Sequence, residues 1–239
     1  MRIVGIMQAR MANAQLPGQV LQLLGGRSVL DRMVRAVRDS AELDDLTVAT
    51  TTEPADDAIA IACDRLGVAV YRGPADDPVR QVIGALETQP ADAAMLFSAE
   101  CPLLDPDLIA AGTRVFRAVP DLDYLSTAIT RTLPHGMDIE IIQADTLRSL
   151  DHLATAEYRG EVTAFLRAYP DQFRVMGLTM PPERADLRLS LDTMEDFALI
   201  SMVVSHFGDS AVSVTKLVEW LDANPAVRAL NAHVERVAA

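Results

Sequence analysis

The opening of the chain, residues 2–34, reads RIVGIMQARMANAQLPGQVLQLLGGRSVLDRMV. Its first seven residues, 2–8, form a short apolar run that predicts a buried strand. A helix is predicted from about Ser28, because apolar residues then recur at helical spacing and Ser28 and Asp31 suit a helix N-terminus. The connection between this strand and this helix is unusually long, and long connections are often functional.

The same alternation of apolar runs and amphipathic segments continues through the first half of the chain. Three more buried strands are predicted at 46–50, 68–71 and 93–97. Apolar residues at helical spacing predict a helix after each of the first three strands. This rhythm predicts an α/β fold with a mostly parallel, Rossmann-like sheet and helices on both faces.

The second half of the chain has a more mixed pattern. Its predicted helices are 105–116, 145–153, 156–168, 194–207, 214–222 and an amphipathic tail at 225–237, and its predicted strands are 124–127, 139–142, 173–178 and 187–191. The stretches near 124–142 and 173–178 suggest a second, small sheet. Without a repeat or a long linker, we expect one domain over 1–239, with a C-terminal helical part from about 213.

Composition limits the classes of function. The formal net charge of −13 over 239 residues argues against nucleic acid as a partner, because phosphate-backbone binding needs a cationic face. No run approaches the ~18 apolar residues of a spanning helix, and the opening lacks a signal-peptide pattern, so we expect a cytoplasmic protein with no membrane partner. Cys63 and Cys101 lack CxxC spacing, and we expect both to be reduced and buried.

The long connection after the first strand is the candidate binding segment. In an open parallel sheet, ligands bind beyond the carboxyl ends of the strands, which is where this connection begins. It contains neither GxGxxG nor GxxxxGK[ST], so it is neither a dinucleotide-binding turn nor a P-loop. We therefore expect it to line a cleft of another kind.

Several ordered segments of the chain carry a family resemblance. QAR at 8–10 and LPG at 16–18, with a Gly-rich stretch before VLDRMV, resemble the opening of the cytidylyltransferases that make CMP-activated sugar acids. The likeness continues through VATTTEPADDAI, ECPLLDP, HGMDIEI, LSLDTMEDF and LDANPAVRALNAHV. The chain is identified as a member of that family, on its branch of spore-coat polysaccharide proteins and CMP-KDO synthetases, with the nucleotide-diphospho-sugar transferase type of fold.

The resemblance implies a nucleotidyl transfer in surface polysaccharide or glycoconjugate biosynthesis. A hydroxyl of an acidic sugar, or a phosphate oxygen of a sugar or polyol phosphate, attacks the α-phosphorus of CTP and pyrophosphate leaves. The site must neutralise the triphosphate while charge builds on the leaving oxygen. Relatives use Mg²⁺ on two acids, and the matching positions are Glu100 and Asp192. The resemblance also implies a homodimer, the commonest closed oligomer.

The resemblance also assigns positions in the cleft. Arg10 and Gln19 stand at the catalytic loop positions. The positions that match the family's nucleotide-binding segments are Ala9, Arg10, Met11, Ala12, Asn13, Gln15, Gly18, Gln19, Thr52, Asp76, Ser98 and Ala99. His135, Asp138 and Glu140 are expected on the acceptor side. Asp138 and Glu140 alternate with apolar residues, so a position on the solvent-exposed face of a strand explains them equally well.

Two acidic pairs that follow strands have alternative interpretations. Asp56 and Asp57 either face the mouth of the cleft or act as first-turn acids that suit a helix dipole, and the second is the commoner pattern. Asp76 and Asp77 have the same two interpretations. The four histidines are scattered without ligand spacing, which argues against a zinc site.

This chain lacks several cations that the family carries. Losing one donor to a developing oxyanion lowers a rate by roughly 10²–10³. Lys216 is the only lysine and lies in the C-terminal helical part. Besides Arg10, Arg27 is the only cation between the first strand and the first helix, and it could turn toward the site. Neutral or acidic residues stand at family positions as follows: Asn13 for Ser, Gln15 for Arg, Gln19 for Lys, Gln81 and Leu96 for Arg, Ala99 for Gly and Glu161 for His.

Two hypotheses about function therefore stay open. In the first, the chain is a working nucleotidyltransferase in which Mg²⁺ and Arg10 carry most of the positive charge. In the second, it is a catalytically impaired relative that binds a nucleotide, a sugar or a protein partner without transfer.

Overall fold

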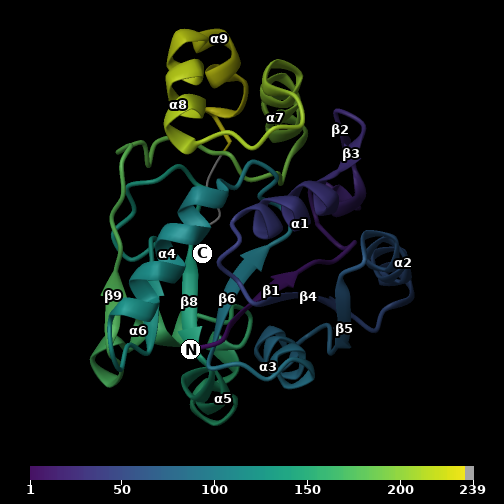
Figure 1. The fold of residues 1–239 in the computed structure, drawn as a ribbon. Coiled ribbons are helices and arrows are strands. Elements are labelled where there is room, and N and C mark those ends of the chain that lie inside the picture. The colour runs from purple at the N-terminus through teal and green to yellow at the C-terminus, as the bar shows by residue number, and fades with distance from the viewer. Residues whose placement is uncertain (235–239) are drawn as a thin grey trace.

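A computed structural model describes residues 1–234 and contains a seven-stranded sheet in the order β5-β4-β1-β6-β8-β7-β9 (Figure 1). Its first half is parallel, as predicted, and consists of β1 (Ile3–Gln8), β4 (Asp45–Thr51), β5 (Ala69–Gly73) and β6 (Ala93–Ser98). The central strand β1 is buried along almost its whole length, which explains its continuous apolar sequence.

The other half of the sheet corrects the expectation of a separate small sheet near 124–142 and 173–178. Those stretches form β7 (Tyr124–Ser126), β8 (Glu140–Gln143) and β9 (Val175–Gly177). Strand β8 pairs antiparallel with β6, so these strands extend the main sheet instead of forming their own. The second sheet in the described residues is a hairpin of β2 (Leu23–Leu24) and β3 (Arg27–Ser28), inside the long connection.

Helices cover both faces of the sheet, as predicted. The first face carries α1 (Val29–Asp39), α2 (Asp57–Leu66) and α4 (Pro106–Ala118), and the second carries α3 (Pro78–Thr88), α5 (Ala144–Leu153) and α6 (Ala164–Ala168). The core of the first face continues into α7 (Met194–Phe207) and α8 (Val214–Ala223), which lie beyond the sheet (Figure 1). Side chains of β1 alternate between the two faces: Ile3 and Met7 pack on the first face, and Val4 and Ile6 on the second.

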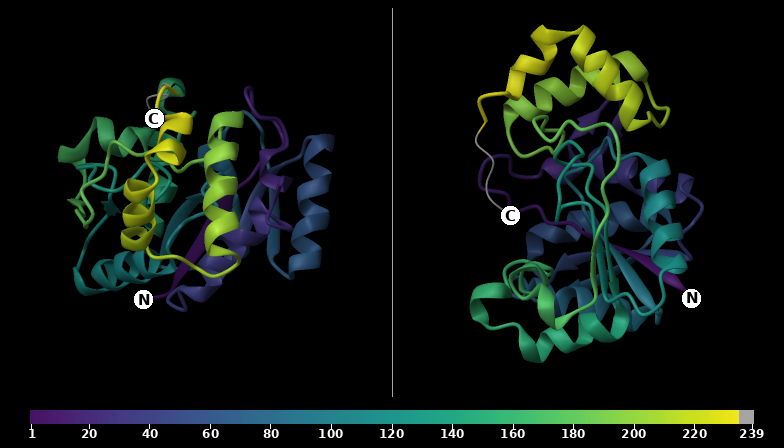
Figure 2. Two further views of the ribbon diagram at one scale, coloured as in Figure 1. Left: turned by 90° about the horizontal axis from the view of Figure 1, so that it is seen from above. Right: turned by 90° about the vertical axis from the view of Figure 1, so that its left-hand side faces the viewer.

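The predicted start of α1 is confirmed. The Ser28 hydroxyl accepts a hydrogen bond from the backbone N–H of Asp31 at 3.1 Å. The C-terminal helices α7, α8 and α9 (Pro225–Arg228) gather at one end of the molecule, far from α5 (Figures 1 and 2). Within residues 1–234, every helix is too short or too polar to cross a membrane.

The predicted strand at 187–191 is wrong. The segment has strand-like alternation because Leu187, Leu189 and Leu191 are all buried. Its backbone, however, bonds to two different loops: Leu189 N–H donates to His135 and Leu191 N–H donates to Glu100. It therefore makes one isolated bridge and no ladder within the described residues.

Two predicted helices are shorter than expected. The segment 156–168 is broken into a 3-10 turn (Ala156–Tyr158) and α6, because Gly160 disfavours a helix and Thr163 turns its hydroxyl inward to Glu140. The tail prediction of 225–237 holds only for α9, followed by a 3-10 turn, and 235–237 lie outside the described residues. The thiol of Cys63 is buried as expected, whereas Cys101 is only partly buried.

Gly136 offers a test of the turn that positions His135 and Asp138. Its φ is +94°, and a Cβ there would lie 2.6 Å from the backbone nitrogen of Ser190. Gly136→Ala is expected to lower the free energy of unfolding by about 3 kcal/mol, from left-handed strain plus a backbone clash. Gly67→Ala is the control, since Gly67 has φ +60° with nothing near its Cβ, and about 1 kcal/mol is expected. Equal losses in urea denaturation would contradict this packing.

Candidate functional site

A cleft of about 810 Å³ opens at the carboxyl ends of β1 and β6. Its walls come from the long connection, the end of β6, the start of α3 and residues 160–162. The predicted site residues that line it are Ala9, Arg10, Ala12, Asn13, Gln19, Ser98, Ala99 and Glu100. The long connection therefore lines a cleft, as its position after β1 predicts.

The remaining predicted nucleotide-binding residues lie outside the walls of this cleft. Met11 packs against the hydrophobic core, and Gly18 adopts φ +73° and donates its N–H to the carbonyl of Met11 at 2.8 Å. Gln15, Thr52 and Asp76 are exposed. The cleft is lined instead by their neighbours Thr51 and Ala75, and by Asn13, whose Oδ1 accepts the N–H of Gln15 at 2.9 Å.

Asp56 holds the long connection against the end of β4. It is 2% exposed, and its Oδ1 accepts the backbone N–H of Met11 at 2.7 Å. Its Oδ2 accepts both the backbone N–H and the hydroxyl of Thr51. The cleft-mouth interpretation of this residue is therefore wrong. Asp56 does lie in the first turn of the 3-10 helix that starts at Pro54, as the other interpretation predicts, but its carboxylate also holds the loop on the end of β4.

The second acid of each pair has a simpler role. Asp57 is exposed and pairs with Arg72 at 2.6 Å. Asp77 caps α3 by accepting the N–H of Arg80 at 3.1 Å, and Arg159 donates to its other oxygen at 2.7 Å. Asp77 is therefore the N-cap of α3 and not a first-turn acid, and it also ties α3 to the segment that carries Glu161.

Gln19 lies deep in the cleft against Glu100. It is 5% exposed, and its Nε2 donates to Glu100 Oε2 at 2.9 Å. Its Oε1 is buried and has no hydrogen-bond partner in residues 1–234. Because Gln19 also lines the cleft, this oxygen is available to a donor or a cation bound there.

Glu100 lines the cleft, and Asp192 lies beside Glu100 without being one of the residues that line the cleft. The N–H of Leu191 donates to the carbonyl of Glu100 at 2.8 Å, which brings the two segments together. Burial, and then the negative charge of Asp192, raise the pKa of Glu100. The predicted acid pair is therefore adjacent in space, although its members are far apart in sequence.

The donor set around this pair fits a divalent cation. Two carboxylates supply hard oxygens and Gln19 Oε1 is an unused third, while Mg²⁺ keeps several waters and binds through one or two carboxylates plus phosphates. No group of three or more His, Cys, Asp or Glu side chains gathers for a metal anywhere in residues 1–234. The pair alone thus suits an ion that ligand phosphates help to hold.

A buried arginine, Arg188, holds Asp192 in place. Its Nε donates to both oxygens of the fully buried Asp196, at 3.0 and 3.1 Å, and its Nη2 donates to Asp192. Ser190 Oγ donates to the same Asp192 oxygen at 3.0 Å, and Asn231 donates to Asp196 at 2.8 Å. Sequence reasoning missed this network, for which the only signal was the four-residue spacing of 188, 192 and 196.

The cleft has one unpaired cation on its rim. Arg10 is exposed and makes no hydrogen bond or ion pair with the rest of residues 1–234. The idea that Arg27 could turn toward the site is wrong, because Arg27 is bound to Asp209 at 2.8 Å and to Asp31 at 3.2 Å and lines a different cavity.

Several positions that depart from the family pattern do face the cleft. Gln81 is buried in its wall and accepts a hydrogen bond from Gln8 Nε2 at 3.2 Å. Glu161 also lines it and is bound by Arg167. Leu96 instead lies in the hydrophobic core of the second sheet face. The low positive charge of the cleft therefore follows from its lining residues, Gln19 and Gln81 above all.

The acceptor-side residues form two separate clusters. Asp138 accepts from Arg131 Nη1 at 2.6 and 2.8 Å and lies 3.6 Å from His135 Nδ1. Burial opposes ionisation of Asp138, but His135 and Arg131 outweigh it and lower its pKa. Burial, then the carboxylates of Glu100, Asp138 and Asp192, raise the pKa of the Cys101 thiol, which places Asp138 on the same side as the acid pair.

Glu140 belongs to the second cluster. It accepts from the Tyr124 hydroxyl and from Thr163 Oγ1 at 3.1 Å, and it lies 3.7 Å from Arg167. Burial raises its pKa, and none of its partners in the described residues is shared with Asp138. A solvated strand face is therefore wrong for both acids, and only Asp138 lies near Glu100.

Comparisons with known proteins agree with this geometry. A family model described as cytidylyltransferase matches residues 4–219. The spore coat polysaccharide biosynthesis protein SpsF of Bacillus subtilis is 30% identical over 93% of this chain and 95% of its own length. A 3-deoxy-manno-octulosonate cytidylyltransferase of Bdellovibrio bacteriovorus is 24% identical over 95% of this chain and 80% of its own length.

A solved structure is similar along the whole chain. The structure of a cytidylyltransferase from Leptospira borgpetersenii covers 100% of both chains with a TM-score of 0.92 at 24% identity. At this identity the likeness speaks for the fold. It confirms the predicted α/β class with a mostly parallel, helix-covered sheet and a small additional β element.

Adjacent residues test how the loop is held. Asp56→Ala leaves the N–H of Met11 and both donors of Thr51 without their buried acceptor, so the free energy of unfolding should fall by about 3 kcal/mol. Asp57→Ala removes an exposed ion pair and should cost less than about 1 kcal/mol. Urea denaturation of both variants measures the difference. If Asp56→Ala lowered the free energy of unfolding no more than Asp57→Ala does, the hydrogen bonds of Asp56 would not stabilise the fold.

Proposed function

We propose a reaction for this chain, which belongs to the cytidylyltransferase family. It transfers CMP from CTP to an acidic sugar or to a related sugar or polyol phosphate and releases pyrophosphate. The observation that carries the proposal is Glu100, which lines a cleft rimmed by Arg10 and has Asp192 beside it. The predicted resemblance to the sugar-acid and spore-coat branch is confirmed by the family match and by the two curated relatives.

The names of the relatives support the class of acceptor. One is named for spore coat polysaccharide and the other for 3-deoxy-manno-octulosonate, an eight-carbon acidic sugar. The acceptor proposed for this chain is therefore an acidic sugar destined for a surface polysaccharide or glycoconjugate. A cytoplasmic homodimer without nucleic-acid or membrane partners completes the proposal, and it rests on the family resemblance and the net charge of −13.

Charge is the main demand on this site. The triphosphate of CTP carries about four negative charges, and more charge builds on the leaving oxygen during transfer. Mg²⁺, held by Glu100 and Asp192, would neutralise phosphate charge when bound. Arg10 supplies a guanidinium with all five donors free within the described residues, which suits phosphate oxygens. Gln19 adds an amide at the family's lysine position but no charge.

The acceptor side supplies orientation. The acceptor oxygen forms a bond to the α-phosphorus as the bond from that phosphorus to the bridging oxygen breaks, and pyrophosphate departs with the electron pair. When the acceptor is a hydroxyl, its proton is released to water. Asp138 is kept ionised by His135 and Arg131, and its lowered pKa makes it a weak base. Its role in this proposal is therefore to accept a hydrogen bond from the acceptor and orient it, on the Cys101 side of the acid pair.

Pyrophosphate release tests the proposal directly. With CTP, Mg²⁺ and 3-deoxy-manno-octulosonate as the acidic sugar, the wild-type chain is expected to release pyrophosphate. Arg10→Gln should reduce the rate by roughly 10²-fold, since one positioned cation to the phosphates is lost. Arg65→Gln, an exposed arginine of α2 outside the cleft, is the control and should leave the rate unchanged.

The same assay separates the proposal from its alternative. Release with CTP but with no other nucleoside triphosphate supports cytidylyl transfer. If CTP with Mg²⁺ raises the melting temperature while a panel of acidic sugars and polyol phosphates gives no pyrophosphate, the chain is a binding member of its family that does not catalyse transfer.

Gln19 tests whether the neutral loop limits nucleotide binding. Gln19→Lys places an ammonium beside Glu100, where negative charge is already crowded, and should tighten CTP binding by about tenfold, or ~1.4 kcal/mol. Gln22→Lys makes the same charge change just after the cleft segment and serves as the matched control. Isothermal titration of CTP with Mg²⁺ measures both. If Gln19→Lys bound CTP more weakly than Gln22→Lys, a cation at position 19 would not neutralise the phosphates of CTP.

A further inference from the structure

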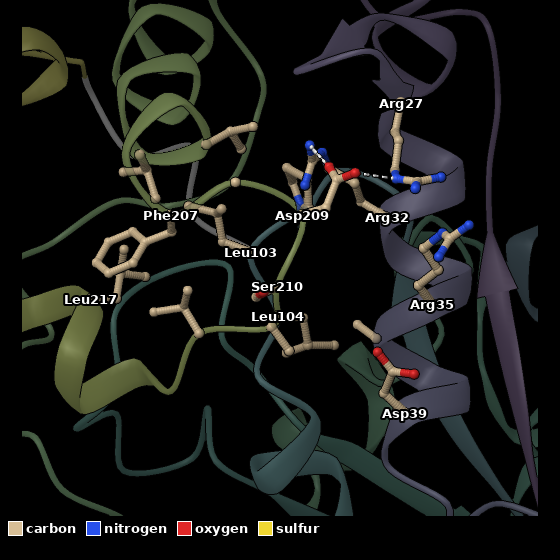
Figure 3. A pocket seen from close by; sticks show the side chains of 17 residues that line it. Arg27, Arg32, Arg35, Asp39, Leu103, Leu104, Phe207, Asp209, Ser210 and Leu217 are labelled. Atoms are coloured by element: carbon tan, nitrogen blue, oxygen red, sulfur yellow. Dashed lines mark hydrogen bonds and ion pairs between the residues drawn. The ribbon is translucent and has the colours of Figure 1, made fainter.

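A second cavity of about 580 Å³ lies apart from the cleft (Figure 3). It is enclosed by α1, by residues 102–104, by the end of α7 and by residues 208–212, and Leu217 of α8 closes one side. It shares no lining residue with the cleft.

The two walls of this cavity differ in chemistry. Leu103, Leu104, Phe207 and Leu217 form an apolar wall. Facing them is an arginine wall, formed by Arg27 next to α1 and by Arg32 and Arg35 on α1 (Figure 3). An apolar body and an anionic group on one ligand would each find a matching surface here.

The arginine wall has donors to spare. Arg27 uses Nε for Asp209 and Nη1 for Asp31, and Arg35 uses only Nε, for Asp31 at 2.8 Å. Arg32 donates from both Nε and Nη2 to the carbonyl of Leu24, and its Nη2 also donates to Asp209. One terminal nitrogen each of Arg27 and Arg32, and both of Arg35, therefore have no hydrogen-bond partner within residues 1–234.

One arginine of this wall is well buried. Two aspartates, Asp39 and Asp209, line the cavity with the three arginines, and Asp31, which pairs with Arg27 and Arg35, lies just outside the lining. Arg32 is only 9% exposed in its side chain, so its charge is poorly screened by water. Free guanidinium N–H groups in such a place match the two oxygens of a carboxylate.

We propose that this cavity is a binding site for a small amphipathic carboxylate. The carboxylate bonds to the free nitrogens of Arg27 and Arg35, and the apolar body packs against Leu103, Phe207 and Leu217. The segment that forms the apolar floor begins two residues after Glu100, so one stretch of chain contributes to both the cleft and this cavity.

The test uses 1-pyrenebutyric acid, a fluorescent amphipathic carboxylate, titrated into the full chain. One saturable site per chain is expected, with at least fivefold weaker binding of 1-pyrenebutanol, which keeps the ring and lacks the charge. Arg35→Gln should weaken pyrenebutyrate at least fivefold. Arg148→Gln is the matched control, because Arg148 is likewise an exposed helical arginine paired with one aspartate of its own helix.

Location is tested by filling the cavity. Ala211 is exposed at its rim, so Ala211→Trp should abolish pyrenebutyrate binding, with circular dichroism confirming the fold. If Ala211→Trp fails to fold, the titration of pyrenebutyrate into Arg35→Gln and the titration of 1-pyrenebutanol into the wild type still test the proposal. Equal binding of acid and alcohol, binding unchanged in Arg35→Gln or in folded Ala211→Trp, or no saturable binding at millimolar probe would each overturn the proposal.

Discussion

Two carboxylates, Glu100 and Asp192, meet where β6 ends, and burial makes their shared negative charge unfavourable. The fold keeps them together from both sides. The backbone of residue 191 bonds to that of Glu100, and Arg188 clamps Asp192 while Asp196 neutralises the arginine. A protein gains no stability from crowding like charges, so the arrangement makes physical sense as a site that a cation and a phosphate chain complete.

The sheet and its covering helices could be predicted because their signals are local. A buried parallel strand such as β1 is a continuous apolar run, and α1 shows helical periodicity with Ser28 as its cap. The acid pair and the cleft position of Arg10 came from motif resemblance, since no local pattern relates residues 100 and 192. The strand prediction for 187–191 was wrong because its buried leucines alternate as they do in a strand. Its backbone N–H groups, however, donate to the carbonyls of two separate loops.

The roles of Asp56 and Arg188 could not be predicted, because their partners are set by tertiary structure. Asp56 accepts from an amide 45 residues earlier, and an acid after a strand and before a helix has a far commoner use as a helix-start residue. Arg188 and its two aspartates are spaced as on one helix face, yet the first two lie before α7 begins. Both residues hold functional segments in place without lining the cleft themselves.

The central claim is that the acid pair holds a divalent cation for a nucleotide. Electron paramagnetic resonance of Mn²⁺ titrated into the protein with CTP measures this most directly. The Mn²⁺ bound by CTP without protein is subtracted. Wild type should then remove free Mn²⁺ at one further site, and Asp192→Asn should lose that site. Glu195→Gln, an exposed acid at the start of α7, should behave as wild type. Mn²⁺ binding that is the same in Asp192→Asn and wild type would contradict the account.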